Sequence, residues 1–337
     1  MAAWVIAVFV IGYLAIALEH ALKVNKAATA LVTGILCWTI FVLSSGNAEL
    51  VTEKLGHHLG ELSQILFFLL GAMTIVELID AHDGFEIITK RITTRNKRKL
   101  IWIVGLLTFF LSAVLDNLTT TIVMVSLVRK LMADRKDRLM FVGAIVISAN
   151  AGGAWSPIGD VTTTMLWIGG QITATNIIAK LIIPSLVCLL VPLLAFQFLL
   201  KGNAPPLQHE DYTGDGKPNE LHRNIVFFSG VGILLMVPVF KAITHLPPFM
   251  GILLGLGILW IIVEILHSGK DEQDRRIYTV AYALRKIDTP SILFFLGILL
   301  AIAALESTGL LQQLATAIDA KIKDINIVVL VIGLLSS

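Results

Sequence analysis

Repeated apolar segments long enough to cross a membrane are the feature that most limits what this chain can fold into. Each is close to the length that spans a hydrocarbon core about 30 Å thick. They lie at about residues 3–18, 29–45, 63–79, 178–200, 224–240, 249–267 and 290–305. Charged residues make up only 15% of the chain, whereas soluble proteins carry about 25%. This composition argues against one large soluble core and predicts an all-α polytopic membrane protein with the lipid bilayer as a partner.

Two further apolar regions do not fit a simple span. Residues 100–128 would form a straight helix about 44 Å long, which is too long for the membrane. This region is interrupted by Asp116, Asn117 and three threonines. Basic residues flank it on both sides, so the positive-inside rule places both ends in the cytoplasm. We therefore expect a re-entrant hairpin at about 100–128 that turns at Asp116 and Asn117.

The second region, at about 139–168, contains the sequence SANAGGAWSPIGDVTTT. It has basic residues only on its N-terminal side, so it should cross the membrane once. Glycine and proline within it predict a helix broken at Gly152-Gly153 and Pro157. Neither break region has a nearby lysine or arginine in the sequence.

An internal repeat accompanies this pattern. The segment 65–92 resembles 292–318, and both begin with the letters ILFF. The loops assigned to the cytoplasm hold 21 of the 26 Lys and Arg residues, and in this topology the two copies run in opposite directions. Inverted repeats with broken helices are typical of secondary transporters. A chance match between two apolar helices is the alternative.

The repeat also predicts how the chain is organised. Because the second copy stops before its own hairpin, we expect the natural protein to continue for about a hundred residues. The predicted parts are N-terminal transmembrane helices at 1–62, a first repeat at 63–200, a cytoplasmic linker at 201–223, scaffold helices and a loop at 224–289, and the start of a second repeat at 290–337.

The polar residues of the two broken regions have the chemistry of a cation site. Dehydrated Na⁺ needs several oxygen ligands, which carboxylate, amide and hydroxyl groups supply. The predicted ion and proton site comprises Asp116, Asn117 and Thr119 on the hairpin and Ser148, Asn150, Asp160, Thr162 and Thr163 on the broken helix, with Asp116, Asn117, Asn150 and Asp160 as the Na⁺ ligands. Asp116 is the leading candidate, because a proton and a cation would compete for its carboxylate oxygens. Helix capping is the alternative role for Asp116 and Asp160.

Three further residues are secondary candidates. Glu77 and Glu306 lie near opposite ends of corresponding spans, as a symmetric pair of vestibule carboxylates would, although solvated helix ends explain them as well. Ser112 precedes Asp116 by one helical turn, and its hydroxyl could instead bond to its own helix.

Other residue types indicate no chemistry. The histidines His20, His57, His58 and His82 lie in predicted connections, where we expect them to be solvated. There is no phosphate-binding Gly-Lys-Ser/Thr loop, and the basic residues form no single face for nucleic acid. We expect no enzymatic activity and no cofactor.

Three segments resemble the NhaD-type sodium/proton antiporters of the ion transporter superfamily: FLSAVLDNLTTTIVMVSLVRKL, ISANAGGAWSPIGDVTTTMLW and LEHALKVNKAATALVTGILCW. The resemblance implies two inverted repeats, each with a re-entrant hairpin and a broken transmembrane helix. It also implies a separate scaffold, a homodimer, and exchange of Na⁺ or Li⁺ for H⁺ in pH homeostasis, with the bacterial inner membrane as the location. The chain departs from that pattern in lacking the second half of the second repeat.

Two other functions remain open from the sequence. An oxyanion or carboxylate transporter of the same fold would need a cation near its breaks. An intramembrane hydrolase would use Asp116 and Asp160 as a dyad, although hydroxyl-rich breaks favour transport.

Overall fold

The computed structural model describes residues 2–89, 92, 94–132, 134–204, 219–269, 276–321 and 327–330. The predicted all-α polytopic class is confirmed, because the described residues contain no β-strand and seven of their helices are long and apolar enough to cross a membrane. The helices are α1 (Ala2–Ala17), α2 (Glu19–Leu22), α3 (Lys26–Ser45), α4 (Ala48–Ala81), α5 (Glu86–Thr89), α6 (Lys97–Leu115), α7 (Asn117–Leu131), α8 (Arg135–Ala154), α9 (Val161–Ile168), α10 (Ala174–Leu199), α11 (Glu220–Thr244), α12 (Pro248–Leu266), the 3₁₀ helix η1 (Arg276–Tyr278), α14 (Val280–Lys286), α15 (Thr289–Ser307) and α16 (Leu310–Lys321).

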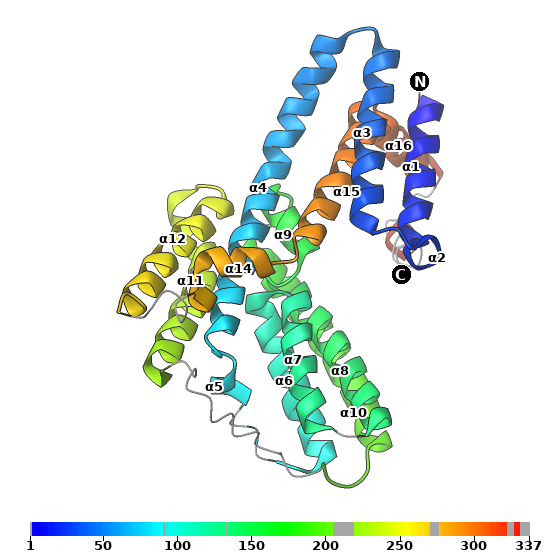
Figure 1. The fold of residues 1–337 in the computed structure, drawn as a ribbon. Coiled ribbons are helices and arrows are strands. Elements are labelled where there is room, and N and C mark those ends of the chain that lie inside the picture. The colour runs from blue at the N-terminus through cyan, green and yellow to red at the C-terminus, as the bar shows by residue number, and fades with distance from the viewer. Residues whose placement is uncertain are drawn as a thin grey trace. The chain divides into compact units, whose positions relative to one another are not determined.

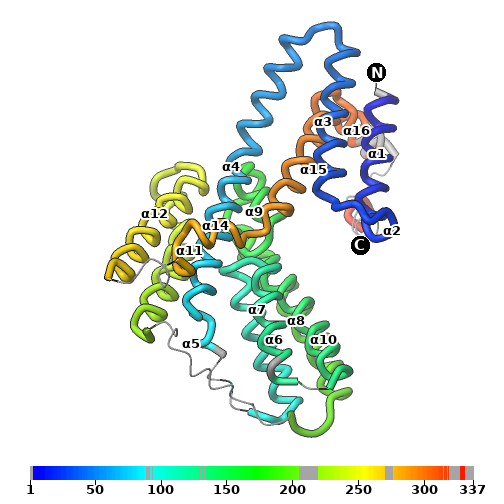
Figure 2. Tube along the Cα trace, viewed as in Figure 1, coloured from blue at the N-terminus to red at the C-terminus, as the bar shows by residue number. Residues whose placement is uncertain are grey.

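The chain divides into two compact units, of which the first contains residues 1–66 and 288–337. In this unit α3 packs against both α1 and α15 (Figure 2). Glycines make the close approach of α3 and α15 feasible, because a Cβ on Gly297 would lie 2.4 Å from the backbone of Ala30 and Leu31. The indole Nε1–H of Trp38 donates to the carbonyl oxygen of Leu300 at 2.9 Å and so ties the same two helices together.

The second unit contains residues 67–287 and carries both predicted breaks. Helices α6, α7, α8 and α10 run side by side in it (Figure 1). Their shared core is built from large side chains with almost no exposure, including Phe109, Phe141, Ile145 and Leu189. Helices α11 and α12 pack on each other and share a buried cluster with the second half of α4, which includes Ile75, Ile79, Val226 and Ile252.

One expected connection is helical. The polar stretch before the third span was expected to be a loop that holds His57 and His58, but α4 begins at Ala48 and includes both histidines. Asn47 caps this helix by accepting the Leu50 N–H at 3.1 Å. The stretch AELVTEKLGHHLGELSQ contains no proline and is rich in Leu and Glu, which favour helix.

The expectation of a solvated His82 is wrong. His82 is fully buried at the end of α4. Its Nδ1 lies 2.7 Å from the carbonyl oxygen of Leu78 and its Nε2 lies 3.0 Å from Nε2 of His267. The ring also packs against Tyr278. These contacts compensate for the removal of the imidazole from water.

The internal repeat stays a prediction. In both copies the first helix ends close to a residue in the left-handed conformation, Asp83 with φ 54° and Gly309 with φ 77°, and a short helix follows. Most of the predicted linker 201–223 and the last residues of the second copy lie outside the described residues.

Candidate functional site

The first break lies at Asp116, between α6 and α7. Its backbone has φ 117° and ψ 157°, a conformation that residues with a side chain rarely adopt. The side chain compensates by capping α7: Oδ1 accepts the Thr119 N–H at 2.8 Å and Oδ2 accepts the Thr119 hydroxyl at 2.7 Å. Asp116 therefore fixes the turn with both carboxylate oxygens.

The second break lies between Ala154 and Val161. It begins later than expected, because Gly152 and Gly153 belong to the last turn of α8. Their role is close approach: a Cβ on Gly152 would lie 2.1 Å from the Phe109 carbonyl oxygen of α6. Asp160 caps α9, since its Oδ2 accepts the backbone N–H groups of Thr162 at 2.9 Å and Thr163 at 3.3 Å.

Asn117 connects the two breaks. Its amide Nδ2 donates to Asp160 Oδ1 at 2.8 Å and to Asn150 Oδ1 at 3.1 Å. Asn150 is on the last turns of α8 and Asp160 is at the start of α9. One amide at the first residue of α7 thus contacts both sides of the second break.

Two serine hydroxyls that donate to backbone carbonyls hold the two break regions together. The Ser112 hydroxyl donates to the Ala149 carbonyl at 2.6 Å, and the Ser156 hydroxyl donates to the Ala113 carbonyl at 2.5 Å. Ser112 therefore does not bond to its own helix, which excludes the alternative considered for it. Because both serines are buried, their bonds fix α6 against α8 and the second break.

Two buried hydroxyl groups on the helices around the breaks lack a hydrogen-bond partner among the described residues. Ser148 is 1% exposed and Thr120 is fully buried, and neither Oγ has a hydrogen-bond partner within the described part of the chain. Both lie on the helices that pack around the breaks, α8 and α7. A buried hydroxyl without a partner costs about 1–3 kcal/mol, so these oxygens are available to a ligand or to water.

The predicted residues divide by location. Seven of them lie in two hydrogen-bonded sets that meet where Asp116 and Asn117 are neighbours in the chain: Asp116 with Thr119, and Asn117 with Asn150, Asp160, Thr162 and Thr163. The two threonines after Asp160 take part through their backbone N–H groups rather than their side chains. Ser148 is buried and outside this network.

Within the described residues, the two vestibule candidates form no hydrogen bond to either of these two sets. Glu77 forms an ion pair with Lys286, whose Nζ is 3.3 Å from its Oε1. Glu306 is exposed and belongs to the other compact unit.

Sequence reasoning missed one cation. Lys241 on α11 donates from Nζ to the Trp167 carbonyl at 2.8 Å and lies 4.6 Å from the centre of the Trp167 ring. It therefore neutralises the C-terminal end of the short helix α9. The sequence placed Lys241 at the end of an ordinary span, and nothing in it indicated the contact with α9.

The arrangement can bind a cation through oxygen atoms. Asn150 Oδ1 and Asp160 Oδ1 both point at the Asn117 amide, whose N–H groups carry a partial positive charge. A carboxylate or amide oxygen has more than one lone pair, so these oxygens can accept a cation in place of the amide. The negative charge of Asp160 also acts on Asp116. The two carboxylates therefore make the region between the breaks favourable for positive charge.

Membrane-length helices with two breaks that meet through polar side chains define the class of secondary membrane transporters. The chain belongs to the Citrate transporter (CitMHS) family, whose profile matches residues 4–337.

Relatives from plants and bacteria support this assignment. Sodium/proton antiporter 1 and Sodium/proton antiporter 2 of Arabidopsis thaliana are 47% and 44% identical over 98% of this chain. The Na(+)/H(+) antiporter NhaD of Vibrio cholerae is 30% identical over 98% of this chain and 73% of its own length. The resemblance to NhaD-type proteins is confirmed. The chain spans 57% of the length of the first Arabidopsis relative and 78% of the second.

Proposed function

We propose that the protein exchanges Na⁺ or Li⁺ for H⁺ across its membrane, with the carboxylates of Asp116 and Asp160 as the shared cation and proton site. The observation that carries this proposal is the position of Asn117, which bonds to Asn150 and Asp160 and directly follows Asp116, the N-cap of α7. The names of the relatives, which are sodium/proton antiporters, agree with it.

The geometry supports a specific mode of cation binding. In the described state the NH₂ group of Asn117 faces the two oxygens. Rotation of this amide by half a turn would bring its own oxygen beside Asn150 Oδ1 and Asp160 Oδ1. Na⁺ would then have three oxygen ligands from side chains, and Asp116 or the unpaired Ser148 hydroxyl could supply another.

Exchange follows from competition for the same oxygens. A carboxylate in a poorly hydrated place binds either a proton or a cation, because an unpaired negative charge is costly there. If the carrier changes its access only when one of the two is bound, then flow of Na⁺ in one direction requires flow of H⁺ in the other.

The site disfavours the two alternatives. A citrate or oxyanion would approach two carboxylates that repel it, and Lys241, which bonds to the Trp167 carbonyl, lies at the opposite end of α9 from Asp160. A hydrolytic dyad needs two carboxylates in contact, yet within the described residues Asp160 bonds to Asn117 and Asp116 bonds to Thr119.

The protein is an integral multi-pass membrane protein. Its assembly as a homodimer and its location in a bacterial inner membrane remain part of the proposal, and the two plant relatives make a plant membrane the location to compare.

The test is an ion-dependent change in a pH gradient. Everted membrane vesicles that carry the full-length protein are given an imposed pH gradient, which a fluorescent dye reports, and Na⁺, Li⁺ or K⁺ is added over an alkaline pH series. Na⁺ or Li⁺ should dissipate the gradient. Asp116→Asn should abolish this response, because asparagine caps a helix about as well as aspartate but carries no charge.

The matched control is Asp134→Asn. Asp134 caps α8 in the same way, accepting the N–H groups of Lys136 and Asp137 at 3.1 Å, but it is exposed and outside the breaks. This variant should retain wild-type exchange. If both variants behave alike, or if no alkali cation changes the gradient, the proposal fails.

A further inference from the structure

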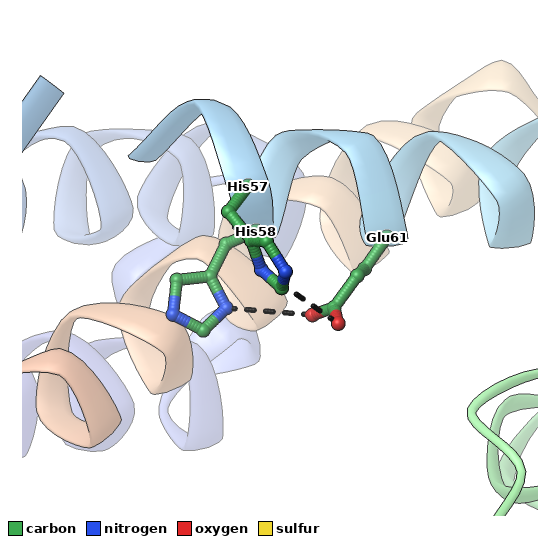
Figure 3. Close-up of side chains that lie close together, drawn as sticks. All are labelled: His57, His58 and Glu61. Atoms are coloured by element: carbon green, nitrogen blue, oxygen red, sulfur yellow. Dashed lines mark ion pairs between the residues drawn. The ribbon is translucent and has the colours of Figure 1, made fainter. Parts of the chain in front are cut away.

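Two adjacent histidines and a glutamate form a cluster near the N-terminal end of α4. His57 and His58 direct their Nδ1 atoms toward the two carboxylate oxygens of Glu61, one turn later on the same helix (Figure 3). Nδ1 of His57 is 3.8 Å from Oε1, and Nδ1 of His58 is 3.6 Å from Oε2. One nitrogen or oxygen atom from each of the three side chains lies within 4.8 Å of the others.

These separations suit a shared metal ion better than direct hydrogen bonds. A nitrogen and an oxygen joined by a hydrogen bond lie about 2.7–3.2 Å apart. Two ligands of one tetrahedral Zn²⁺, each at about 2.0–2.1 Å from the ion, lie about 3.3 Å apart. His57 and Glu61 are 74% and 60% exposed, so small rotations of their side chains close the remaining gap.

His58 is held in the orientation that a metal ligand requires. Its Nε2 lies 3.0 Å from the Ser307 hydroxyl at the end of α15. When Nε2–H donates to that hydroxyl, the proton is fixed on Nε2 and the Nδ1 lone pair faces Glu61. A second hydrogen bond of this kind orients most metal-binding histidines. The His58 ring also packs near the indole of Trp38 and is only 17% exposed.

The nearby cation is already engaged. Lys54 lies one turn before His58 on α4, and its Nζ donates to the Ser307 carbonyl oxygen at 3.2 Å and lies 5.8 Å from the centre of the Phe41 ring. The charge of Lys54 therefore offsets the partial negative charge at the C-terminal end of α15, and the Glu61 carboxylate faces the two imidazoles instead of Lys54.

We propose that His57, His58 and Glu61 bind a divalent transition-metal ion of the Zn²⁺ class, separate from the Na⁺ and H⁺ site. Two imidazole nitrogens and one carboxylate oxygen are the ligands of zinc sites that keep a position open for water. The same set discriminates against Na⁺, Mg²⁺ and Ca²⁺, which prefer oxygen ligands alone. Through Ser307, the bound ion links the start of α4 to the end of α15.

The direct test is titration of Zn²⁺ into purified full-length protein that has been stripped with EDTA, followed by calorimetry at pH 8. We expect one Zn²⁺ per chain, and no binding of Mg²⁺ or Ca²⁺ at the same concentrations. His58→Gln and Glu61→Gln should each weaken Zn²⁺ binding at least about tenfold, and Ser307→Ala should weaken it about 10–100-fold by releasing His58.

The matched control is His20→Gln, because His20 is an exposed histidine outside the cluster. This variant should bind Zn²⁺ as the wild type does, and thermal unfolding without metal should show that all variants are folded. The proposal is overturned if the wild type binds no Zn²⁺, or if His58→Gln and Glu61→Gln leave the Zn²⁺ affinity unchanged.

Discussion

Asn117 Nδ2 lies 2.8 Å from Asp160 Oδ1, so the first residue of α7 holds the residue that caps α9. The same amide reaches Asn150 on α8. Three helical segments that meet at two breaks are therefore joined by one side chain. A change in the hydrogen-bond partners of Asn117 would therefore alter the structure at both breaks. A site that couples ion binding to a change of access requires such a connection.

Asn117→Ala should impair cation binding more than folding. The variant loses both hydrogen bonds of the amide, and with them one proposed oxygen ligand of Na⁺. We expect the KM for Na⁺ in the vesicle assay to rise at least about tenfold, which corresponds to about 1.4 kcal/mol. Asn224→Ala is the control, since Asn224 is exposed on α11. Equal KM values for Asn117→Ala and wild type would refute the ligand role of Asn117.

Gly152→Ala should destabilise the second unit. The new methyl group would meet the backbone of Phe109, whose carbonyl oxygen lies only 2.1 Å from the Cβ position. Backbone cannot move aside as a flexible side chain can, so we expect a loss of about 1–3 kcal/mol of stability and a lower Tm in detergent. Gly143→Ala on the same helix is the control, because its Cβ would lie 3.6 Å from Phe196. A Tm for Gly152→Ala equal to that of Gly143→Ala would contradict the close packing of α6 and α8.

Lys241→Met should loosen the short helix α9. The variant keeps the length of the side chain but loses the charged hydrogen bond to the Trp167 carbonyl and the contact with the Trp167 ring. A charged hydrogen bond contributes about 1.5–3 kcal/mol. We expect faster amide hydrogen exchange in residues 161–168 than in the wild type. The control is Lys180→Met, which changes an exposed lysine on α10 and should leave this exchange rate unaltered. Similar exchange rates in the two variants would contradict the proposal that Lys241 anchors α9.

Lys286→Gln should lower stability in a manner that depends on pH. Burial opposes the charge of Lys286, but the nearby Glu77 carboxylate outweighs this and raises the pKa of Lys286 above its ordinary value of 10.5. A raised pKa in the folded state means that the charged lysine stabilises the fold fully below pH 10.5, and that this contribution disappears as the pH rises through the folded-state pKa.

The Tm difference between wild type and Lys286→Gln should therefore be constant from about pH 7 to 9.5 and shrink above about pH 10.5. Lys286→Arg, which retains a positive charge, should keep most of the wild-type Tm at pH 8. A Tm difference that grows at high pH would contradict the ion pair.

The sequence was sufficient to predict the membrane class and the position of the first break. Length and hydropathy define the spans, and a carboxylate followed by an amide inside an apolar run has few structural solutions other than an interrupted helix. Asp116 and Asp160 were recognisable because aspartate before a threonine-rich segment is both a helix cap and a cation ligand.

Other features depend on contacts between distant segments and could not be read locally. Gly152 looked like the point of the break but instead permits contact with Phe109, more than forty positions earlier in the chain. His82 looked like a loop residue but is buried against His267 and Tyr278. In each case the residue type is compatible with two environments, and only the packing decides between them.

The most direct test of the central claim is the apparent affinity for Na⁺ measured as a function of pH, from transport currents of the reconstituted full-length protein on a solid-supported membrane. If H⁺ and Na⁺ compete for the same carboxylates, the Na⁺ concentration for half-maximal current should rise about tenfold for each unit of pH below the pKa of the site, while the maximal current at saturating Na⁺ stays the same. A half-maximal concentration that does not change with pH would contradict the account, because Na⁺ and H⁺ would then bind at separate places.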